Sequence, residues 1–388
     1  MKILHIISSG GMYGAEAVIL NLSRTLNEGA HRSLLGVFSN FSNPNIQLHE
    51  CASREGIESH LISCGGQIDL SAIAGIRELV SLTGADVVHA HGYKADIYVY
   101  CALRNAGIPI ISTCHTWYDN DRKARFYGVV DRFVLRSYAK VVAVSEDVRL
   151  RLIRAGVRAK KISVIGNGID LRPFDYAPAI LKKELGWSAY PLVGLVGRLA
   201  VEKGVDVFLL AAARVLAQRS DAKFVVAGDG PDRSELDALI DKLGIYGSVR
   251  MLGRRDDMPS LYASLDVMVS SSRLEGLPIA ILEGMASRLP VVATAVGEVP
   301  SVVRDGRTGV LVPSQDMESL AIAILELLRN PAQRERLGSA ARQLIEDEFS
   351  AERMAADYLQ VYEEVIASVA KGKERANESS SATRGESR

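Results

Sequence analysis

The sequence predicts an α/β protein built from two doubly wound, parallel-sheet (Rossmann-like) domains that face each other across a cleft. Short runs rich in valine and isoleucine alternate with amphipathic helical stretches along most of the chain. The alternation lapses once, between Asn167 and Pro191, and then restarts. A chain of 388 residues, 48% of them hydrophobic, is also long enough to fill two cores.

We place the first domain at residues 1–170. Its expected strands are 2–7, 33–38, 58–62, 86–90, 109–114, 140–145 and 162–165. Its expected helices are 14–27, 69–82, 94–105, 122–138 and 147–155. The strand segments are bounded by Gly, Asp or Asn, and such alternation forms βαβ units and hence a parallel sheet.

An interdomain linker is expected at 171–190, because residues 167–170 signal a turn and Pro173 and Pro178 break regular structure. The second domain, 191–350, repeats the first pattern. Its expected strands are 192–197, 223–227, 249–252, 266–270, 290–293 and 309–312. Its expected helices are 204–217, 232–242, 256–263, 279–287, 316–329 and 331–345. A last helix at 351–370 precedes a polar, serine-rich segment, 371–388, that we expect to be a disordered tail.

Composition gives no sign of a nucleic-acid partner, because 46 basic and 46 acidic residues balance to a net charge of zero. The four cysteines form no CxxC pair, so we expect reduced thiols. Residues 1–5 lead directly into a strand without the features of a signal peptide, and no stretch is long and apolar enough to span a membrane. We therefore expect a cytoplasmic protein.

Two glutamates are the most informative residues. Seven residues separate Glu275 from Glu283. Gly276 and Pro278 force a turn after the first glutamate, and Pro278 suits the first position of a helix that carries the second. Free N–H groups at a helix start favour a phosphate, and the acids on either side favour hydroxyl groups. A nucleotide-sugar has this layout of ribose, diphosphate and hexose.

Two cations flank the loop that follows the strand at 192–197. Arg198 and Lys203 stand beside the start of the next helix, where they could clamp a diphosphate. Taken alone, the pair fits surface charge equally well, but the glutamates in the same domain favour phosphate binding. Neither a Walker A motif nor G-x-G-x-x-G is present.

The first strand–helix turn contains Gly10, Gly11 and Gly14, which would let the backbone approach a ligand or form a tight turn. No acidic residue ends the strand at 33–38, so we discount NAD binding. The turn around Asp229 is compatible with a phosphate, and a purely structural role explains it equally well.

Histidines gather at predicted strand ends. His115 is expected to face a ligand, whereas His89 suits the core, and no carboxylate or cysteine completes a zinc site with them and His91. Residues 119–121 match the D-x-D metal motif of other sugar transferases, but a turn and helix cap accounts for them. We expect neither a bound metal nor another cofactor.

Residues 121–161 are strongly basic, with twelve lysines and arginines and only four acidic residues. The helix at 122–138 mixes these cations with aromatic residues. Such a helix could rest on anionic lipid at the inner membrane face or attract an anionic acceptor, and an ordinary half-exposed helix explains it equally well.

Together these motifs resemble the family 4 glycosyltransferases, a large group of retaining enzymes with the GT-B fold. The resemblance covers roughly residues 1–350. It rests on Glu275 with Glu283, the Gly197-Arg198…Lys203-Gly204 loop, Gly228–Pro231, Asn167–Asp170, Val144–Glu146 and the N-terminal glycine turn. The family implies transfer of a hexose from a nucleotide-sugar to a glycan, a polysaccharide or a lipid-linked acceptor.

The resemblance also implies roles for individual residues. Arg198 and Lys203 would hold the donor diphosphate, with Gly11 nearby, and Glu283 would bind the ribose. Glu275 would touch the hexose, aided by the amides of Gly276 and Leu277, and His115 would lie near the anomeric carbon. The implied catalytic residues are His115, Arg198, Lys203 and Glu275. The implied nucleobase contacts are Leu252, Gly253 and Arg254. The last helix would pack back on the first domain.

One segment departs from the family pattern. Glu298 stands where a second glycine is usual and Ser301 where a glutamate is usual. This departure leaves open a non-catalytic protein that binds a nucleotide. An epimerase or donor hydrolase on the same fold is a further alternative. UDP- and GDP-linked hexoses both fit the donor site.

Overall fold

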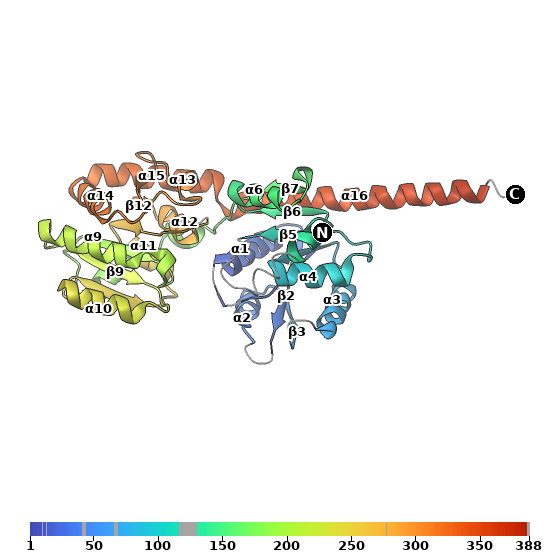
Figure 1. The fold of residues 1–388 in the computed structure, drawn as a ribbon, viewed down its shortest axis with the longest axis horizontal. Coiled ribbons are helices and arrows are strands. Elements are labelled where there is room, and N and C mark those ends of the chain that lie inside the picture. Colours follow the sequence, from blue (N-terminus) through green and yellow to red (C-terminus); the bar gives the residue numbers. More distant parts are fainter. Residues whose placement is uncertain are drawn as a thin grey trace. The chain divides into compact units, whose positions relative to one another are not determined.

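The computed structural model describes residues 1–388 apart from 10, 13, 41–43, 66–68, 116–129, 277 and 386–388, and only the backbone of 372–385. The chain forms two compact units (Figure 1). Unit 1 comprises Met1–Gly168 and Ala351–Arg388, and unit 2 comprises Ile169–Ser350. Each unit has a parallel sheet with helices on both faces, so the predicted fold class is confirmed.

Unit 1 contains seven parallel strands in the order β3-β2-β1-β4-β5-β6-β7. They are β1 (Lys2–Ile7), β2 (Arg32–Ser39), β3 (Ser59–Ser63), β4 (Val87–His91), β5 (Ile110–Cys114), β6 (Lys140–Ala143) and β7 (Ile162–Val164). One face packs against α3 (Leu70–Thr83), α4 (Tyr93–Leu103), a helix at 130–135 and α6 (Glu146–Arg154). The other packs against α1 (Gly14–Glu28), α2 (Gln47–Arg54) and the start of α16 (Ala351–Gly385).

Unit 2 contains six parallel strands in the order β10-β9-β8-β11-β12-β13. They are β8 (Leu192–Val196), β9 (Lys223–Ala227), β10 (Val249–Gly253), β11 (Val267–Ser270), β12 (Val291–Thr294) and β13 (Gly309–Val312). One face packs against α9 (Val205–Gln218), α10 (Arg233–Leu243) and α14 (Met317–Arg329). The other packs against α7 (Arg172–Asp175), α8 (Leu181–Glu184), α11 (Met258–Ala263), α12 (Ile279–Ala286) and α15 (Pro331–Glu348). A short helix, α13 (Val299–Val302), follows β12.

Two segments differ from the sequence-based expectation. Residues 171–190, expected to form a linker, instead belong to unit 2 and bury Leu181 and Trp187 in its core. Residues 371–388 were expected to be disordered, but α16 continues to Gly385. Two features of the sequence explain this continuation. Residues 373–377 are mostly good helix formers, and residues 371–385 contain no proline that would stop the helix.

The sequence led us to expect reduced cysteines and no membrane-spanning segment. All four cysteines, Cys51, Cys64, Cys101 and Cys114, are free. Among the helices of the described residues, none combines the length and the apolar character needed to cross a bilayer.

Candidate functional site

The predicted site residues of unit 2 lie at the carboxyl-terminal edge of its sheet. Strand β8 pairs with β9 on one side and β11 on the other, and helices α9 and α12 pack on opposite faces. The loops that leave β8 and β11 therefore diverge, and such a switch point is where parallel α/β sheets bind ligands. A backbone hydrogen bond joins the two loops: the main-chain N–H of Arg273 donates to the Glu202 carbonyl over 2.8 Å.

Lys203 and Glu275 form the centre of this site. The Lys203 ammonium pairs with the Glu275 carboxylate, which also accepts a 2.9 Å hydrogen bond from Ser272 Oγ. The Glu275 side chain is only 9% exposed, whereas Lys203 is 26% exposed. The pair therefore fixes both side chains at the switch point, with the cation on the solvent side. Arg198 lies on the same loop as Lys203 and is exposed.

Glu283 is partly buried on α12, one turn beyond the helix start. Tyr262 Oη donates a 2.9 Å hydrogen bond to Glu283 Oε2. Burial raises the pKa of Glu283 to about 7, against a smaller opposing effect of the Tyr262 bond. The carboxyl group can therefore change charge near neutral pH. Pro278 occupies the N-cap position directly before α12, rather than the first helical position that it was expected to suit.

Glycines hold the loops of the site in close contact. Gly228 has a φ of +141°, and a β-carbon there would overlap the Gly197 carbonyl. The Leu199 N–H donates to the Asp229 carbonyl over 3.0 Å, so the loops after β8 and β9 pack backbone to backbone. The Asp229 carboxylate accepts from the Gly230 N–H over 2.8 Å, as expected of a turn residue.

Replacing Gly228 with alanine should destabilise unit 2 by about 2–4 kcal/mol, since the clash with the Gly197 carbonyl adds to a backbone strain of about 1–3 kcal/mol. Gly244→Ala is the matched control, because Gly244 also has a positive φ, +69°, but a β-carbon there meets no atom within 4 Å. Urea unfolding followed through the fluorescence of Trp187, which is buried in unit 2, gives both values when Trp117 is replaced with Phe in every variant. Equal losses for the two variants would contradict the close-contact argument.

Gly297 supports the segment that departs from the family pattern. Its φ is +52°, and a β-carbon there would overlap the Glu275 carbonyl. Ser301 Oγ donates to the Glu298 carbonyl over 2.7 Å, which closes the turn at the start of α13. The glycine that contacts Glu275 is thus retained, while the two substituted positions lie in and before a short helix.

The expected nucleobase segment lies at the carboxyl end of the outer strand β10, which includes Leu252 and Gly253. Leu252 and Gly253 are partly buried, and Arg254 is exposed. The Gly228 N–H donates to the Gly253 carbonyl over 2.8 Å, which attaches this segment to the glycine loop. Gly276 is described and partly buried, whereas Leu277 lies outside the described residues.

The other two predicted site residues, Gly11 and His115, belong to unit 1. The Gly11 N–H donates to Ser9 Oγ over 3.2 Å at a φ of +145°. His115 directly follows β5 and is partly buried, and burial lowers the pKa of its imidazole to about 4. The ring is therefore neutral at physiological pH. The D-x-D residues 119–121 lie outside the described part of the chain.

Sequence reasoning missed His5, which completes a buried histidine cluster with His89 and His91. His5 Nδ1 and His91 Nε2 are 3.0 Å apart, and the His89 and His91 ring centroids are 4.0 Å apart. His89 bonds the hydroxyls of Thr113 at 2.7 Å and Tyr362 at 2.9 Å. Ligating nitrogens of all three lie within 4.8 Å of one another. Because both His89 nitrogens already bond hydroxyls, the cluster resembles a hydrogen-bonded core more than a metal site.

Two family models match the chain. Residues 12–172 match Glycosyltransferase Family 4, and residues 179–344 match Glycosyl transferases group 1. Alpha-D-kanosaminyltransferase of Streptomyces kanamyceticus is 30% identical over 297 residues, which cover 72% of this chain and 77% of that protein. D-inositol 3-phosphate glycosyltransferase of Salinispora arenicola is 32% identical over 314 residues, which cover 73% and 69%.

Solved structures agree on the fold. HepE of Anabaena, solved in complex with UDP, has a TM-score of 0.83 at 23% identity and covers 94% of this chain and 100% of its own. Sucrose-phosphate synthase of Thermosynechococcus elongatus has a TM-score of 0.80 at 20% identity and covers 95% and 100%. With both halves matched and named transferases among its relatives, the chain belongs to the family 4 glycosyltransferases and is an enzyme with the GT-B fold.

Proposed function

We propose that this enzyme transfers a hexose, with retention of anomeric configuration, from a nucleoside-diphosphate sugar to a glycan, polysaccharide or lipid-linked acceptor. The observation that carries the proposal is the arrangement at the switch point of unit 2. Arg198 and Lys203 provide positive charge there, and Glu275 and Glu283 provide acceptors for hydroxyl groups. HepE of Anabaena has been solved with UDP-glucose, which supports a nucleotide-sugar donor.

In this proposal the bond between the anomeric carbon and the diphosphate oxygen breaks, and the acceptor oxygen bonds to the same carbon. Arg198, Lys203 and the free N–H groups of the α12 start stabilise the negative charge that develops on the diphosphate. The acceptor proton passes to a phosphate oxygen of the donor. His115, held neutral by burial, contacts the sugar without carrying charge. These cations do the work that a metal does in other transferases, so we propose that no metal is needed.

Thermal unfolding of the purified protein with UDP, GDP, ADP or NAD, each with and without EDTA, tests the donor site. We expect one nucleoside diphosphate to stabilise the protein, unaffected by EDTA. Stabilisation by NAD alone would overturn the proposal. Release of nucleoside diphosphate is then measured with and without acceptor. Acceptor-independent release would indicate the hydrolase or epimerase alternative, and binding without any release would indicate a non-catalytic protein.

Nucleotide affinity should rise as the pH increases through 7. Ribose hydroxyls donate to Glu283 most strongly when it is ionised, and its pKa of about 7 leaves it mostly protonated at pH 6. We expect binding at pH 6 to be roughly tenfold weaker than at pH 8. Glu283→Gln should bind weakly and with little dependence on pH, as measured by calorimetry. A wild-type affinity that does not change over this range would contradict the role of Glu283.

Peripheral membrane contact belongs to the same proposal, since a lipid-linked acceptor would lie at a bilayer surface. The helix expected at 122–138 is described only from residue 130, and residues 130–135 are helical. Phe133 is 64% exposed on this helix, as a residue that enters a lipid headgroup layer would be.

A further inference from the structure

The amino-terminal edge of the unit 1 sheet carries an excess of positive charge. Residues 97–115, 132–145 and 148–169 contain β5, β6 and β7 together with the chain before each strand, and none of these three segments contains an acidic residue. Acids from elsewhere balance part of the charge: Lys140 pairs with Glu364 at 3.0 Å, Arg149 with Glu146 at 2.7 Å and Arg151 with Asp147 at 2.7 Å. The whole chain has no net charge, so the remaining excess is local.

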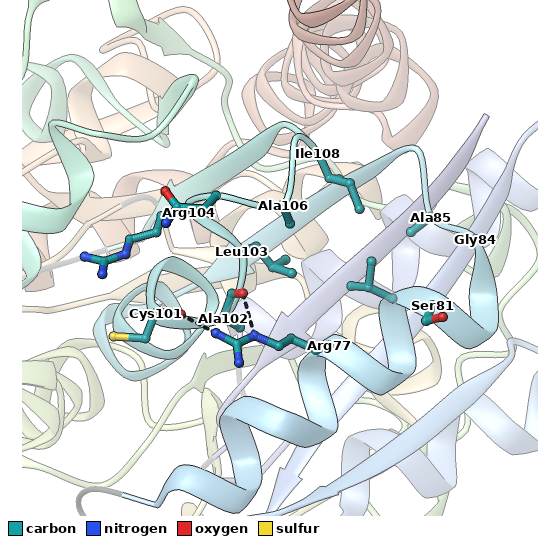
Figure 2. A pocket seen from close by; sticks show the side chains of 12 residues that line it. Arg77, Ser81, Gly84, Ala85, Cys101, Ala102, Leu103, Arg104, Ala106 and Ile108 are labelled. Carbon is teal, nitrogen blue, oxygen red and sulfur yellow. Dashed lines mark hydrogen bonds between the residues drawn. The ribbon is translucent and has the colours of Figure 1, made fainter.

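Helix ends explain some of the remaining cations. Arg77 donates to the Ala102 carbonyl at 2.9 Å and closes the end of α4, beside a hollow of about 670 Å³ (Figure 2). Arg136 donates to the Ala155 carbonyl at the end of α6 over 2.8 Å, and Lys161 donates to the carbonyls of Arg136 and Tyr138. Cations are favourable at helix carboxyl ends, so these three residues need no external partner.

Three further cations, Arg154, Arg158 and Lys160, are not explained in this way. All three are exposed, and no acid within the described residues pairs with them. They lie beside Arg136 and Lys161, since the Arg136 guanidinium lies 2.7 Å from the β-carbon position of Gly156. Burial and the charges of Arg158 and Lys160 lower the pKa of Lys161, as expected in an uncompensated positive field. We call Arg154, Arg158 and Lys160 the cation cluster.

Exposed apolar side chains accompany the cation cluster. Phe133 precedes Arg136 by three residues on the helix at 130–135 and its extension. Leu150, 41% exposed, precedes Arg154 by four residues on α6. Residues three or four apart share a helix face, so each apolar side chain lies one turn from a cation. Cations beside exposed aromatic and aliphatic groups are typical of proteins that rest on anionic bilayers.

We propose that the cation cluster, with Phe133 and Leu150, binds the anionic headgroups of a phospholipid bilayer. This inference rests on the proposed function, because it locates the membrane contact of that enzyme. It places the main attraction on α6 and the segment after it, at the opposite edge of the sheet from His115. The exposed cations are spread over α6 and the segment after it, which favours an extended anionic surface over a single small anion.

The test is co-sedimentation of the full chain with vesicles. One set contains equal parts of phosphatidylglycerol and phosphatidylcholine, and the other contains phosphatidylcholine alone. We expect binding to the first set only, and weaker binding as salt is added. The triple variant Arg154→Gln, Arg158→Gln, Lys160→Gln should bind roughly 100-fold more weakly. A matched control replaces three exposed cations of unit 2, Lys183, Lys242 and Arg307, with Gln, and it should bind as the wild type does.

Three results would overturn the proposal: no binding to anionic vesicles, equal losses in the triple variant and its control, or a preference for homopolymeric RNA over vesicles at the same salt. Unchanged unfolding midpoints verify that the variants fold. Transfer to a water-soluble acceptor separates this inference from the proposed function. The triple variant should retain that transfer if only lipid binding is lost, whereas a wild type inactive on every acceptor would count against the proposed function alone.

Discussion

Replacing Arg198 or Lys203 with alanine should lower kcat/KM for glycosyl transfer by about 100- to 1000-fold, since each removes one charged donor from a developing negative charge. Most of the loss should appear in kcat, because the charge on the diphosphate grows as the glycosidic bond breaks. The structure separates the two variants. Arg198 is exposed, so its loss should leave the fold unchanged. Lys203 neutralises a carboxylate that is only 9% exposed, so its loss should also destabilise unit 2.

Steady-state kinetics and urea unfolding measure the two effects separately. The double variant Lys203→Ala, Glu275→Gln removes the unpaired carboxylate and should recover stability without recovering transfer. Lys242→Ala, an exposed cation of unit 2, is the control for a general change of charge. Transfer at the wild-type rate by Arg198→Ala would remove that residue from the clamp, and a fully stable Lys203→Ala would show that the ion pair contributes little to folding.

Acidification below pH 6.5 should destabilise unit 1 steeply. Burial lowers the pKa of His5 to about 3 and that of His115 to about 4, and it lowers the pKa values of His89 and His91 as well. These rings are neutral when folded but take up protons when unfolded, so the unfolded state binds more protons below pH 6.5. The stability is fully present above pH 6.5 and is lost as the pH falls toward the folded pKa values. Each ring contributes about 1.4 kcal/mol per pH unit.

Hydrogen exchange of the β4 amides under denaturant, at pH 7, 6 and 5, reports unit 1 alone. His5→Asn removes one titrating ring and should reduce the dependence on pH. Tyr362→Phe is the matched control, since it removes the 2.9 Å bond to His89 without removing a ring that titrates in this range. It should lower stability by about 1 kcal/mol at every pH. Equal stability of unit 1 at pH 7 and pH 5 would contradict the argument.

The sequence predicts the central strands well because both of their faces are buried and most of their residues are apolar. Helix α2 was missed because it is only 8 residues long and buries just two of them, Leu48 and Ala52, so its apolar pattern is too short to stand out in the sequence. Residues 171–190 were taken for a linker because their prolines interrupt the pattern, although they fold onto unit 2 as two short helices. Local pattern thus identifies the long elements and fails for short ones that depend on tertiary contacts.

The candidate site was predictable where its charged residues directly follow predicted parallel strands. Arg198, Lys203 and Glu275 all lie in loops after parallel strands, and those ends meet at one edge. The ion pair between Lys203 and Glu275 was not predictable, because the two residues lie 72 positions apart in the chain. The contact of Gly297 with the Glu275 backbone and the role of His5 likewise depend on strand order and register, which no local motif encodes.

The division of the chain has a consequence for synthesis on the ribosome. Unit 2 is one continuous segment, so its residues are all available before translation ends. Unit 1 is discontinuous, because α16 supplies Tyr358 and Tyr362. Until these tyrosines emerge, His89 lacks its bond to the Tyr362 hydroxyl and Thr113 lacks its bond to the Tyr358 hydroxyl. The first domain to be translated is therefore the last to be completed, and a nascent chain must keep that open face from aggregating while the whole of unit 2 is made.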